Sequence, residues 1–290
     1  MKEFYLLSSE HLESSLLFRD DADFMVAMNY VAIQAACCTE VDVLAFILMS
    51  NHVHFILNGT EEDVRHYINQ FKCRYSRYYG RKYGIKEFLR RNKIDLKHVD
   101  YRDDSLERSI AYVQMNCVAA NLCLHPSLYK WGSGNCFFSP VRPLGKRLSD
   151  YSKRALERLL HSNYVSLPSD WIVCNEGYIY PQSYIDIRTV ETAFRTARSM
   201  NYYLNSSSKA KKRIEAADDS LPAFSDQTIL HVLPELYNKL FHKSSFDSLL
   251  EDEQIEMTRQ IRFRFSSDTK QIARVCGISY SRAEHLLDSV

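Results

Sequence analysis

The sequence contains few residues that interrupt regular structure. Of its 290 residues only 8 are glycine and 7 are proline, while 46% are hydrophobic and 25% are charged. Disordered chains have a lower apolar content, so this composition predicts a globular protein. The length is sufficient for two domains, each with its own hydrophobic core.

Long apolar runs and paired cysteines are also missing. No run approaches the roughly 18 apolar residues that cross a bilayer, and the first residues do not resemble a signal peptide. None of the 8 cysteines forms a Cys-x-x-Cys pair. We therefore expect buried thiols without structural disulfides, a cytoplasmic location and no membrane partner.

The net charge of +1 does not indicate a partner, but the distribution of charge does. Between Arg65 and Arg102 there are twelve lysines and arginines and three acidic residues, a local excess of nine positive charges. Tyrosines and phenylalanines lie between them. Such a segment suits single-stranded nucleic acid, whose phosphates bind cations and whose bases stack on rings. A solvated helix face with its aromatic residues in the core has the same pattern.

Residues 44–57 predict a β-hairpin. Two apolar runs meet at Ser50 and Asn51, a pair typical of turns. Because side chains alternate along a strand, His52 and His54 share one face of the second strand, about 7 Å apart. Both imidazoles could reach one metal ion or one phosphate. A pair of hydrogen-bonded structural histidines fits the same spacing.

Hydrophobic periodicity places this hairpin in a β-α-β-β-α-β order. The expected elements are a strand at 3–8, a helix beginning near 20, strands at 41–49 and 52–57, a helix at 61–83 and a strand at 96–101. Thr60 and Asp63 match a capping box. Residues 41–49 are apolar on both faces apart from Asp42, as in an inner strand. The predicted fold class is α+β, a ferredoxin-like split βαβ sandwich with an antiparallel sheet and helices on one face.

A further helix is expected from about Asp103 to Leu124. Tyr112 and Asn116 are four residues apart on it, about 100° from its buried stripe. The stripe comprises Leu106, Ile110, Val113, Cys117, Ala120 and Leu124. Turn-rich sequence then ends a first domain at 1–145. A connecting region at 146–205, with helices near 149–161 and 187–199, precedes a mostly helical region at 206–290 that opens with a linker at 206–212.

The segment 269–287 predicts a helix-turn-helix, with Gly277 at the turn. Its inward residues would be Ala273, Ile278, Ala283 and Leu286. If this motif reads DNA, the outward residues Tyr280, Ser281 and Arg282 would reach base edges or phosphates. A plain helical hairpin is the alternative.

These residues carry a resemblance to the HUH (His-hydrophobic-His) single-tyrosine transposases. The hairpin Leu-Ala-Phe-Ile-Leu-Met-Ser-Asn-His-Val-His-Phe-Ile-Leu resembles the segment that contains their histidine motif. Ala-Tyr-Val-Gln-Met-Asn, which ends at Asn116, resembles their nucleophile helix. The match is closer to the REP-associated tyrosine transposase branch, where an asparagine follows the tyrosine by four residues. The resemblance covers about residues 4–135.

The resemblance implies a metal-dependent transposase or endonuclease that acts on single-stranded or hairpin DNA, as a monomer or homodimer associated with the nucleoid. His52, His54 and Asn116 would bind Mg²⁺ or Mn²⁺. Tyr112 would attack the DNA to form a 5′-phosphotyrosine link and a free 3′-OH, which permits later rejoining. The implied DNA-binding residues are Lys72, Arg74, Arg77, Arg81 and Arg282.

Some positions depart from the family pattern or leave alternatives. Ser50 and Cys117 stand where the family commonly has proline, which suggests a divergent member. Tyr75 and Tyr78 are rival nucleophiles, although neither has a ligand-type residue four positions later. A domesticated, non-catalytic regulatory protein that binds DNA sequence-specifically is the main alternative. A structural zinc site fits poorly because no cysteine pair accompanies the histidines.

Overall fold

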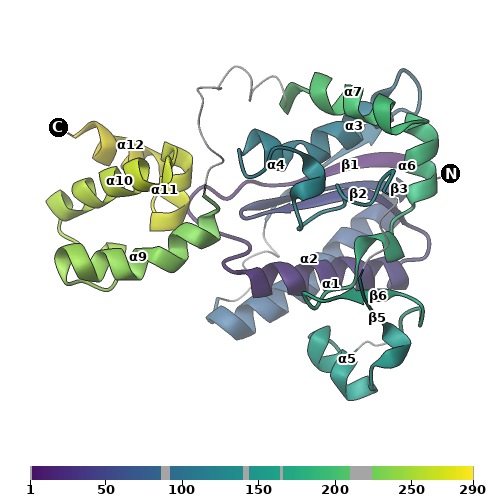
Figure 1. The fold of residues 1–290 in the computed structure, drawn as a ribbon, viewed down its shortest axis with the longest axis horizontal. Coiled ribbons are helices and arrows are strands. Elements are labelled where there is room, and N and C mark those ends of the chain that lie inside the picture. Colours follow the sequence, from purple (N-terminus) through teal and green to yellow (C-terminus); the bar gives the residue numbers. More distant parts are fainter. Residues whose placement is uncertain (1, 86–91, 140–143, 164–165, 210–223, 290) are drawn as a thin grey trace.

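The computed structural model describes residues 2–85, 92–139, 144–163, 166–209 and 224–289. Its centre is a four-stranded sheet in the order β2-β3-β1-β4 (Figure 1). The strands are β1 (Glu3–Ser9), β2 (Asp42–Met49), β3 (His52–Gly59) and β4 (Ile94–Val99). All neighbouring strands are antiparallel, and β3 separates β1 from β2. This is the split βαβ order, so the predicted α+β class is confirmed.

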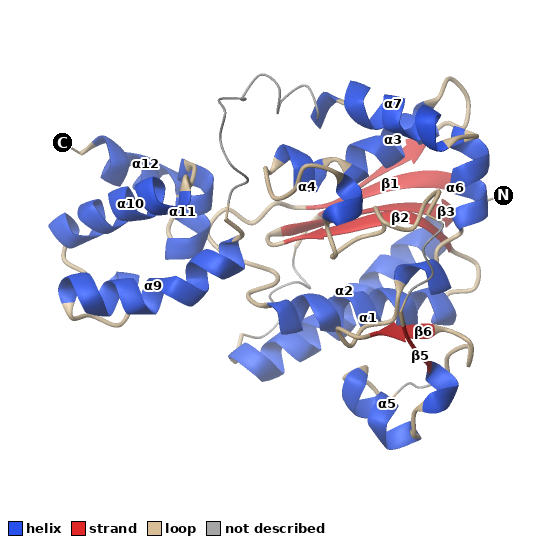
Figure 2. Cartoon of the chain, in the orientation of Figure 1, coloured by secondary structure: helices blue, strands red, loops and turns tan. Residues whose placement is uncertain are grey.

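Helices cover both faces of the sheet. The helices α1 (Asp21–Cys37) and α2 (Glu61–Tyr83) pack together on one face (Figure 2). The helices α3 (Ser105–Gln114), α4 (Asn116–Ala119) and α7 (Ala197–Ser206) lie over the other face (Figure 1). The two helices of the βαβ unit thus share one face, and the segments that follow β4 close the other.

The strand β2 lies at an edge of the sheet, although its apolar pattern predicted an inner strand. A later segment of the chain covers this edge. The Leu48 amide donates to the Trp131 carbonyl at 2.8 Å, and the Ser133 amide donates to the Phe46 carbonyl at 3.0 Å. Because helices cover both faces and this segment covers the edge at Phe46 and Leu48, β2 is buried like an inner strand.

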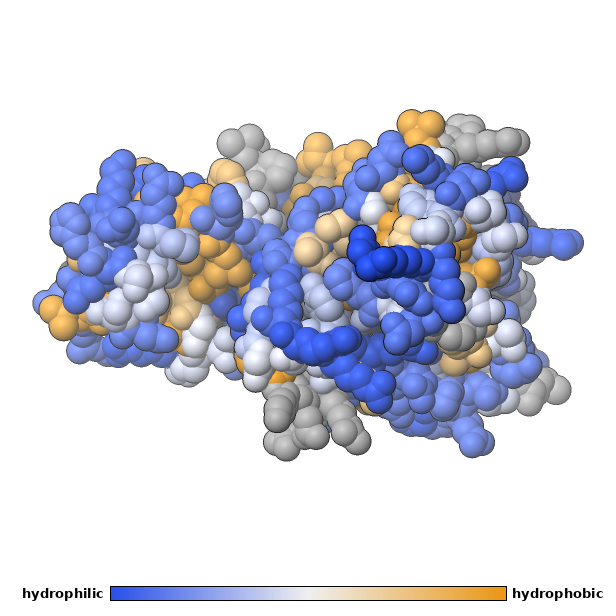
Figure 3. Space-filling view, turned by 90° about the horizontal axis from the view of Figure 1, so that it is seen from below, coloured by the Kyte–Doolittle hydropathy of each residue, from blue (hydrophilic) through white to orange (hydrophobic). Residues whose placement is uncertain are grey.

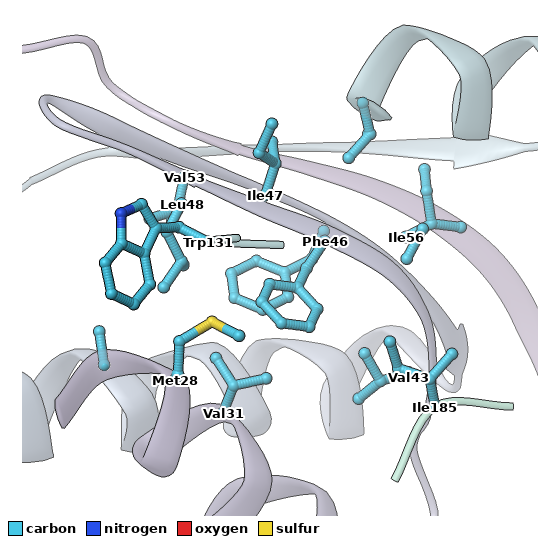
Figure 4. Packing of buried hydrophobic residues seen from close by; sticks show 14 of the residues in the cluster. Met28, Val31, Val43, Phe46, Ile47, Leu48, Val53, Ile56, Trp131 and Ile185 are labelled. Atoms are coloured by element: carbon cyan, nitrogen blue, oxygen red, sulfur yellow. The ribbon is translucent and has the colours of Figure 1, made fainter. Parts of the chain in front are cut away.

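Large side chains fill the space between the sheet and α1. Met28 and Val31 on α1 point toward Phe46 on β2 (Figure 4), and none of the three is exposed. The Trp131 ring stacks on Phe24, with 4.9 Å between the ring centroids. The segment after α4 therefore completes the core on the face opposite α3.

The described residues contain two hydrophobic clusters. The first extends from Tyr5 to Leu204, and the second from Ile229 to Leu286. The first includes buried residues of β6 (Ile172–Cys174), which pairs with β5 (Gly145–Arg147), and of α5 (Lys153–Leu159) and α6 (Ile187–Phe194). The connecting region thus packs onto the first core. The division at 145 and 205 stays a prediction about domains, and residues 210–212 of the predicted linker lie outside the described ranges.

Three predicted helices are shorter than expected. The helix expected at 103–124 is broken at Met115, and Leu124, at 68% exposed, lies outside the core, as does Ala120. The Asn116 side-chain amide donates to backbone carbonyls of the preceding turn, which competes with regular helix bonding. The helix expected at 187–199 is interrupted at Arg195, whose φ is +63°. The helix expected near 149–161 is only the seven-residue α5.

The second core consists of α9 (Asp226–Phe241), α10 (Glu251–Phe265), α11 (Thr269–Cys276) and α12 (Tyr280–Asp288). Gly277 has a φ of +72° at the turn between α11 and α12, a conformation that favours glycine. Ala273, Ala283 and Leu286 are fully buried and Ile278 is partly buried, which fits both a helix-turn-helix and a plain helical hairpin. No helix among the described residues combines the length and the apolar character that a membrane span needs.

Candidate metal and nucleophile site

The two histidines of β3 lie side by side on the face of the sheet that α3 covers. His52 is 6% exposed and His54 is 1% exposed. Their ring centroids are 4.9 Å apart. Phe55, the residue after His54, points to the opposite face of the sheet and packs on Tyr67 and Phe71 of α2. The predicted alternation of β3 is therefore present.

Each buried imidazole is oriented by one hydrogen bond. His52 Nδ1 lies 2.8 Å from Asn51 Oδ1, and His54 Nδ1 lies 2.7 Å from Ser8 Oγ. The Asn51 amide nitrogen donates to the Leu12 carbonyl at 2.8 Å, which turns its oxygen toward His52. Because that oxygen only accepts, His52 Nδ1 carries the proton and Nε2 keeps a lone pair. Such an outer hydrogen bond is the usual way to orient a metal-binding imidazole.

The outer nitrogens of both rings face the site. In the described part of the chain, Nε2 of His52 and Nε2 of His54 have no hydrogen-bond partner. Buried polar atoms are nearly always paired, so two adjacent exceptions call for an explanation. A ligand that accepts two lone pairs, such as a metal ion, would satisfy both atoms.

A third histidine completes this group. The His11 ring stacks on His52 with centroids 3.6 Å apart and lies edge-on to His54 at 6.1 Å. One ligand nitrogen from each of the three rings lies within 4.8 Å of the others. Nitrogens that share one ion are separated by about 3–4 Å, so the three could hold a metal ion after a small rotation of the exposed His11.

The histidines favour the form that binds metals. Burial lowers the pKa of His54 to about 3 and lowers the pKa of His52 well below its usual 6.5. His11 is more exposed, and the partial desolvation of its ring, with a smaller contribution from the charge of Lys209, also lowers its pKa. All three imidazoles are therefore neutral at pH 7, with lone pairs available for a cation.

Tyr112 comes from α3 and faces this group. Its half-buried ring lies 5.7 Å from the His54 ring at an interplanar angle of 76°. It lines a cavity of about 800 Å³ together with His11, His54 and Arg108. The fold thus brings together the predicted phenol and the predicted imidazoles from elements about 60 residues apart in the sequence.

Asn116 is buried at the start of α4, 3% exposed. Its side-chain nitrogen donates to the carbonyls of Tyr112 and Val113 at 2.9 and 3.1 Å. These bonds join the first residue of α4 to the last turn of α3, which contains Tyr112. The role of Asn116 as a metal ligand stays a prediction, and His11 is the residue that the geometry adds to the candidate ligands.

The sequence analysis did not single out His11. It lies in the irregular stretch between β1 and α1, where neither strand nor helix periodicity gives a side chain a direction. One signal was available. His11 lies two residues after the end of β1, and β1 pairs with the histidine strand, with Ser8 opposite His54. A histidine just after a strand that pairs with the strand of two other histidines is a candidate third ligand.

The predicted basic residues of α2 lie on the opposite side of the sheet. Lys72 is 7% exposed and its ammonium donates to the Asn92 carbonyl, so it has a structural partner. Arg74, Arg77 and Arg81 line a groove of about 1470 Å³ between α2 and the region of α5. Figure 3 shows that hydrophilic side chains cover most of this lower face. Three further basic residues of the counted run, Lys86, Arg90 and Arg91, lie outside the described residues.

The rival nucleophiles belong to the core beneath the sheet. The Tyr75 hydroxyl donates to the Leu17 carbonyl at 2.6 Å, and the Tyr78 hydroxyl donates to Asp23 at 3.0 Å. Burial raises the pKa of Tyr75 well above 10 and that of Tyr78 to about 12. Both phenols are therefore held as neutral donors, and α2 packs on the face away from the histidines.

The hairpin turn contacts the second core. Ser50 Oγ donates to Asp226 Oδ2 at 2.6 Å, and the same carboxylate is paired with Arg274 at 2.9 Å. A proline at position 50, as in the resembled family, could not make this contact. A cavity of about 1030 Å³ lies beside this contact, with His11 and His52 in its wall. The histidine group thus borders two cavities.

Arg282, the predicted DNA contact of α12, is half-buried. Its guanidinium pairs with Glu251 at 2.9 Å and donates to Gln254 at 3.2 Å, both on α10. The arginine therefore joins α12 to α10, and its role in DNA binding stays a prediction.

Comparison with known proteins adds little to this geometry. No protein-family model matches the chain, and no curated protein matches it. A solved structure of the REP-associated tyrosine transposase bound to a REP hairpin has a TM-score of 0.35 and 11% identity, over 46% of this chain and 77% of that one. A likeness at this level carries no argument about function, which has to be inferred from the site.

Proposed function

We propose that this protein is a metal-dependent DNA strand transferase that cleaves single-stranded or hairpin DNA through Tyr112. The observation that carries the proposal is the pair of buried imidazoles whose outer nitrogens have no partner in the described structure, with the Tyr112 ring 5.7 Å from the nearer one. In a structural histidine pair, both nitrogens of each buried ring are usually bonded. A purely DNA-binding protein has no need of this arrangement.

We propose that His11, His52 and His54 hold the ion. When bound, a divalent ion supplies positive charge that polarises a phosphodiester. Imidazole nitrogen is a poor ligand for Mg²⁺, which prefers oxygen, whereas later divalent metals accept it readily. We therefore expect Mn²⁺ to support the reaction better than Mg²⁺. If Asn116 also binds the ion, its amide oxygen would be the fourth protein ligand.

The chain's own residues divide the remaining work. The Tyr112 hydroxyl oxygen attacks the phosphorus, and the bond from phosphorus to the 3′-oxygen breaks. The phenolic proton passes to solvent and the leaving 3′-oxygen takes one up, so one phosphodiester replaces another. The product is a 5′-phosphotyrosine link with a free 3′-OH, from which rejoining requires no external energy source.

DNA contacts on the lower face form a separate part of the proposal. Arg77 and Arg81 are exposed on the groove beside α5, where phosphates would meet positive charge from two helices. The sheet lies between this groove and Tyr112. A substrate that uses both surfaces must therefore extend around an edge of the sheet, as a hairpin with a single-stranded tail could do.

The test is covalent capture. Labelled hairpin oligonucleotides with single-stranded flanks are incubated with Mn²⁺ and resolved under denaturing conditions. We expect a protein-DNA adduct that Tyr112→Phe abolishes. Tyr101→Phe is the matched control, because Tyr101 is 60% exposed and stacks on Phe4 away from the histidines. Tight binding without an adduct from any oligonucleotide would contradict the proposal.

That outcome would favour the second candidate function, a non-catalytic DNA-binding protein. One observation supports it independently. The groove with Arg77 and Arg81 lies on the opposite side of the sheet from Tyr112, so DNA binding through it does not require the histidine site. Under this alternative, DNA affinity would be insensitive to Mn²⁺ and to His54→Ala.

A further inference from the structure

The chain returns to the candidate site at the end of α7. This helix packs along α3, with Met200 and Leu204 buried in the first core. Ser207 ends it by donating its backbone amide and its hydroxyl to the Leu204 carbonyl, at 3.3 and 2.9 Å. The residues that follow are thereby directed over the cavity that Tyr112 lines, whose wall includes Ser207 and the residues on either side of it.

Lys209, two residues later, lies against the candidate nucleophile. Its Nζ is 4.8 Å from the centroid of the Tyr112 ring. An ammonium at this distance from a ring face is held by a cation–π interaction. The sequence analysis had placed Lys209 in a linker, outside the region that resembles the transposases. The structure places its charge at the phenol.

The field of Lys209 extends over the whole site. Its positive charge is among the causes that lower the pKa values of His11, His52 and His54. One ammonium is thus close enough to interact with the three imidazoles and the phenol together. The acidic residues of the cavity wall have other partners, because Asp95 pairs with Lys97 at 3.5 Å and Asp104 interacts with Tyr203.

A site with this balance of charge is suited to an anion. The imidazoles are neutral, Lys97 and Arg108 in the cavity wall offset Asp95 and Asp104, and Lys209 adds one positive charge beside Tyr112. We propose that Lys209 binds the phosphate that Tyr112 attacks, which makes it a catalytic residue supplied from outside the sheet domain. This inference rests on the proposed function, since it assigns a further residue to the same site.

The chemistry explains why a second cation is useful. As the bond from Tyr112 to phosphorus forms and the bond to the 3′-oxygen breaks, negative charge builds on the non-bridging oxygens. The histidines can present a cation to one side of the phosphate only. An ammonium beside the phenol ring stabilises the negative charge of the non-bridging oxygens from the side of the nucleophile, and it keeps its proton throughout. Such a fixed charge contributes more in the transition state than in substrate binding.

The test compares Lys209→Gln with Lys209→Arg and with Lys146→Gln. Lys146 is an exposed lysine of β5, outside both the histidine cavity and the arginine groove, so it is the matched control. Single-turnover adduct formation is measured at saturating DNA with Mn²⁺. We expect Lys209→Gln to slow it by about 10²-fold. Lys209→Arg should recover most of the rate, because it restores the charge.

A second readout separates phosphate contact from a structural role. The single-turnover rate is measured with each non-bridging oxygen of the scissile phosphate replaced by sulfur. If Lys209 contacts one of these oxygens, the sulfur effect at that position should shrink several-fold in Lys209→Gln. A variant that only disturbs the fold would slow all substrates by the same factor.

A third readout does not depend on catalysis. The affinity of a short single-stranded oligonucleotide is measured in the Tyr112→Phe background with EDTA present, and Lys209→Gln should weaken it several-fold relative to Lys146→Gln. If wild-type protein forms no adduct, the proposed function fails, and this affinity alone decides whether Lys209 binds phosphate. If Lys209→Gln matches Lys146→Gln in adduct rate and in affinity, Lys209 has no such role, while the proposed function stands.

Discussion

The two faces of the central sheet use similar residue types in different ways. Beneath the sheet, buried tyrosines of α2 donate their hydroxyls to backbone carbonyls: Tyr67 to Val31, Tyr75 to Leu17 and Tyr79 to Leu16. Above it, the outer nitrogens of the buried histidines have no partner among the described residues. Tyr112, on that upper face, is only half-buried and lines a cavity.

This difference separates structural from functional residues in a chain with 19 tyrosines. A buried polar atom that is bonded contributes to the fold, and removing its partner destabilises it. A buried polar atom without a partner is costly unless a ligand binds it. Residue type alone therefore does not identify the site. Other buried atoms of the described residues, such as the Tyr184 hydroxyl, also lack a partner, so the distinguishing feature is two such atoms on adjacent rings beside a cavity.

The largest expected effect tests the tyrosines of the two faces against each other. Tyr75→Ala should lower the free energy of unfolding by about 3–5 kcal/mol, because it removes a fully buried ring. Tyr112→Ala should lower it by about 1 kcal/mol or less. Urea unfolding followed by tryptophan fluorescence measures both, since Trp131 and Trp171 belong to the first cluster. Equal losses would show that the two faces do not differ in this way.

A smaller effect concerns acid. Burial lowers the pKa of folded His54 to about 3 from 6.5, so the unfolded chain takes up this proton first. Stability is therefore complete above pH 6.5 and is lost as the pH falls toward 3, by about 1.4 kcal/mol per pH unit. Between pH 6.5 and 5 this amounts to about 2 kcal/mol. His54→Gln should remove this contribution from the slope of the free energy of unfolding against pH, measured by urea unfolding with EDTA present.

The control for this effect is His98→Gln on β4. His98 is exposed, and its ring lies 3.4 Å from Glu3 at the surface. The same substitution there should leave the slope close to that of the wild type. A wild-type slope unchanged by His54→Gln would mean that the imidazole is not held neutral by the fold.

The smallest effect tests the arginines of the lower face. Arg77→Gln with Arg81→Gln should weaken binding of a hairpin about tenfold and reduce the salt dependence by about two phosphate contacts. Adduct formation on a short single strand should be unchanged, since that strand reaches the upper face alone. Arg65→Gln on the same helix is the control, because Arg65 is exposed and pairs with Glu61 at 2.7 Å. An equal loss of hairpin affinity in the double variant and in Arg65→Gln would show that the groove does not bind the substrate.

Much of the fold could be predicted because its signals are local. The hairpin, the faces of β3 and the N-cap at Thr60 depend on neighbouring residues, and the structure has all three. Of the predicted capping box it has the bond from the Asp63 amide to the Thr60 hydroxyl. Helix lengths after residue 100 were less predictable. A side-chain amide at Asn116 and a positive φ at Arg195 interrupt helices whose apolar pattern continues. The prediction that β2 is an inner strand was also wrong, because later segments bury the edge of the sheet at which β2 lies.

The candidate site was predictable only where its residues lie on regular elements. Strand alternation paired His52 with His54, and helix spacing paired Tyr112 with Asn116. His11 lies in an irregular stretch, where periodicity gives a side chain no direction. Lys209 lies beyond the break at Ser207 that ends α7, so the periodicity of α7 does not place it. Both lie at the site because β1 pairs with β3 and α7 packs on α3.

The sequence by itself determined which side chains share a face of each strand and helix, because the backbone repeats every two or 3.6 residues. Only the tertiary structure decided which faces meet. It placed the basic helix on the opposite side of the sheet from the phenol, and it brought a third imidazole and a lysine to the histidine pair. The reason is physical: packing depends on the burial of whole surfaces across the chain, and no local repeat encodes it.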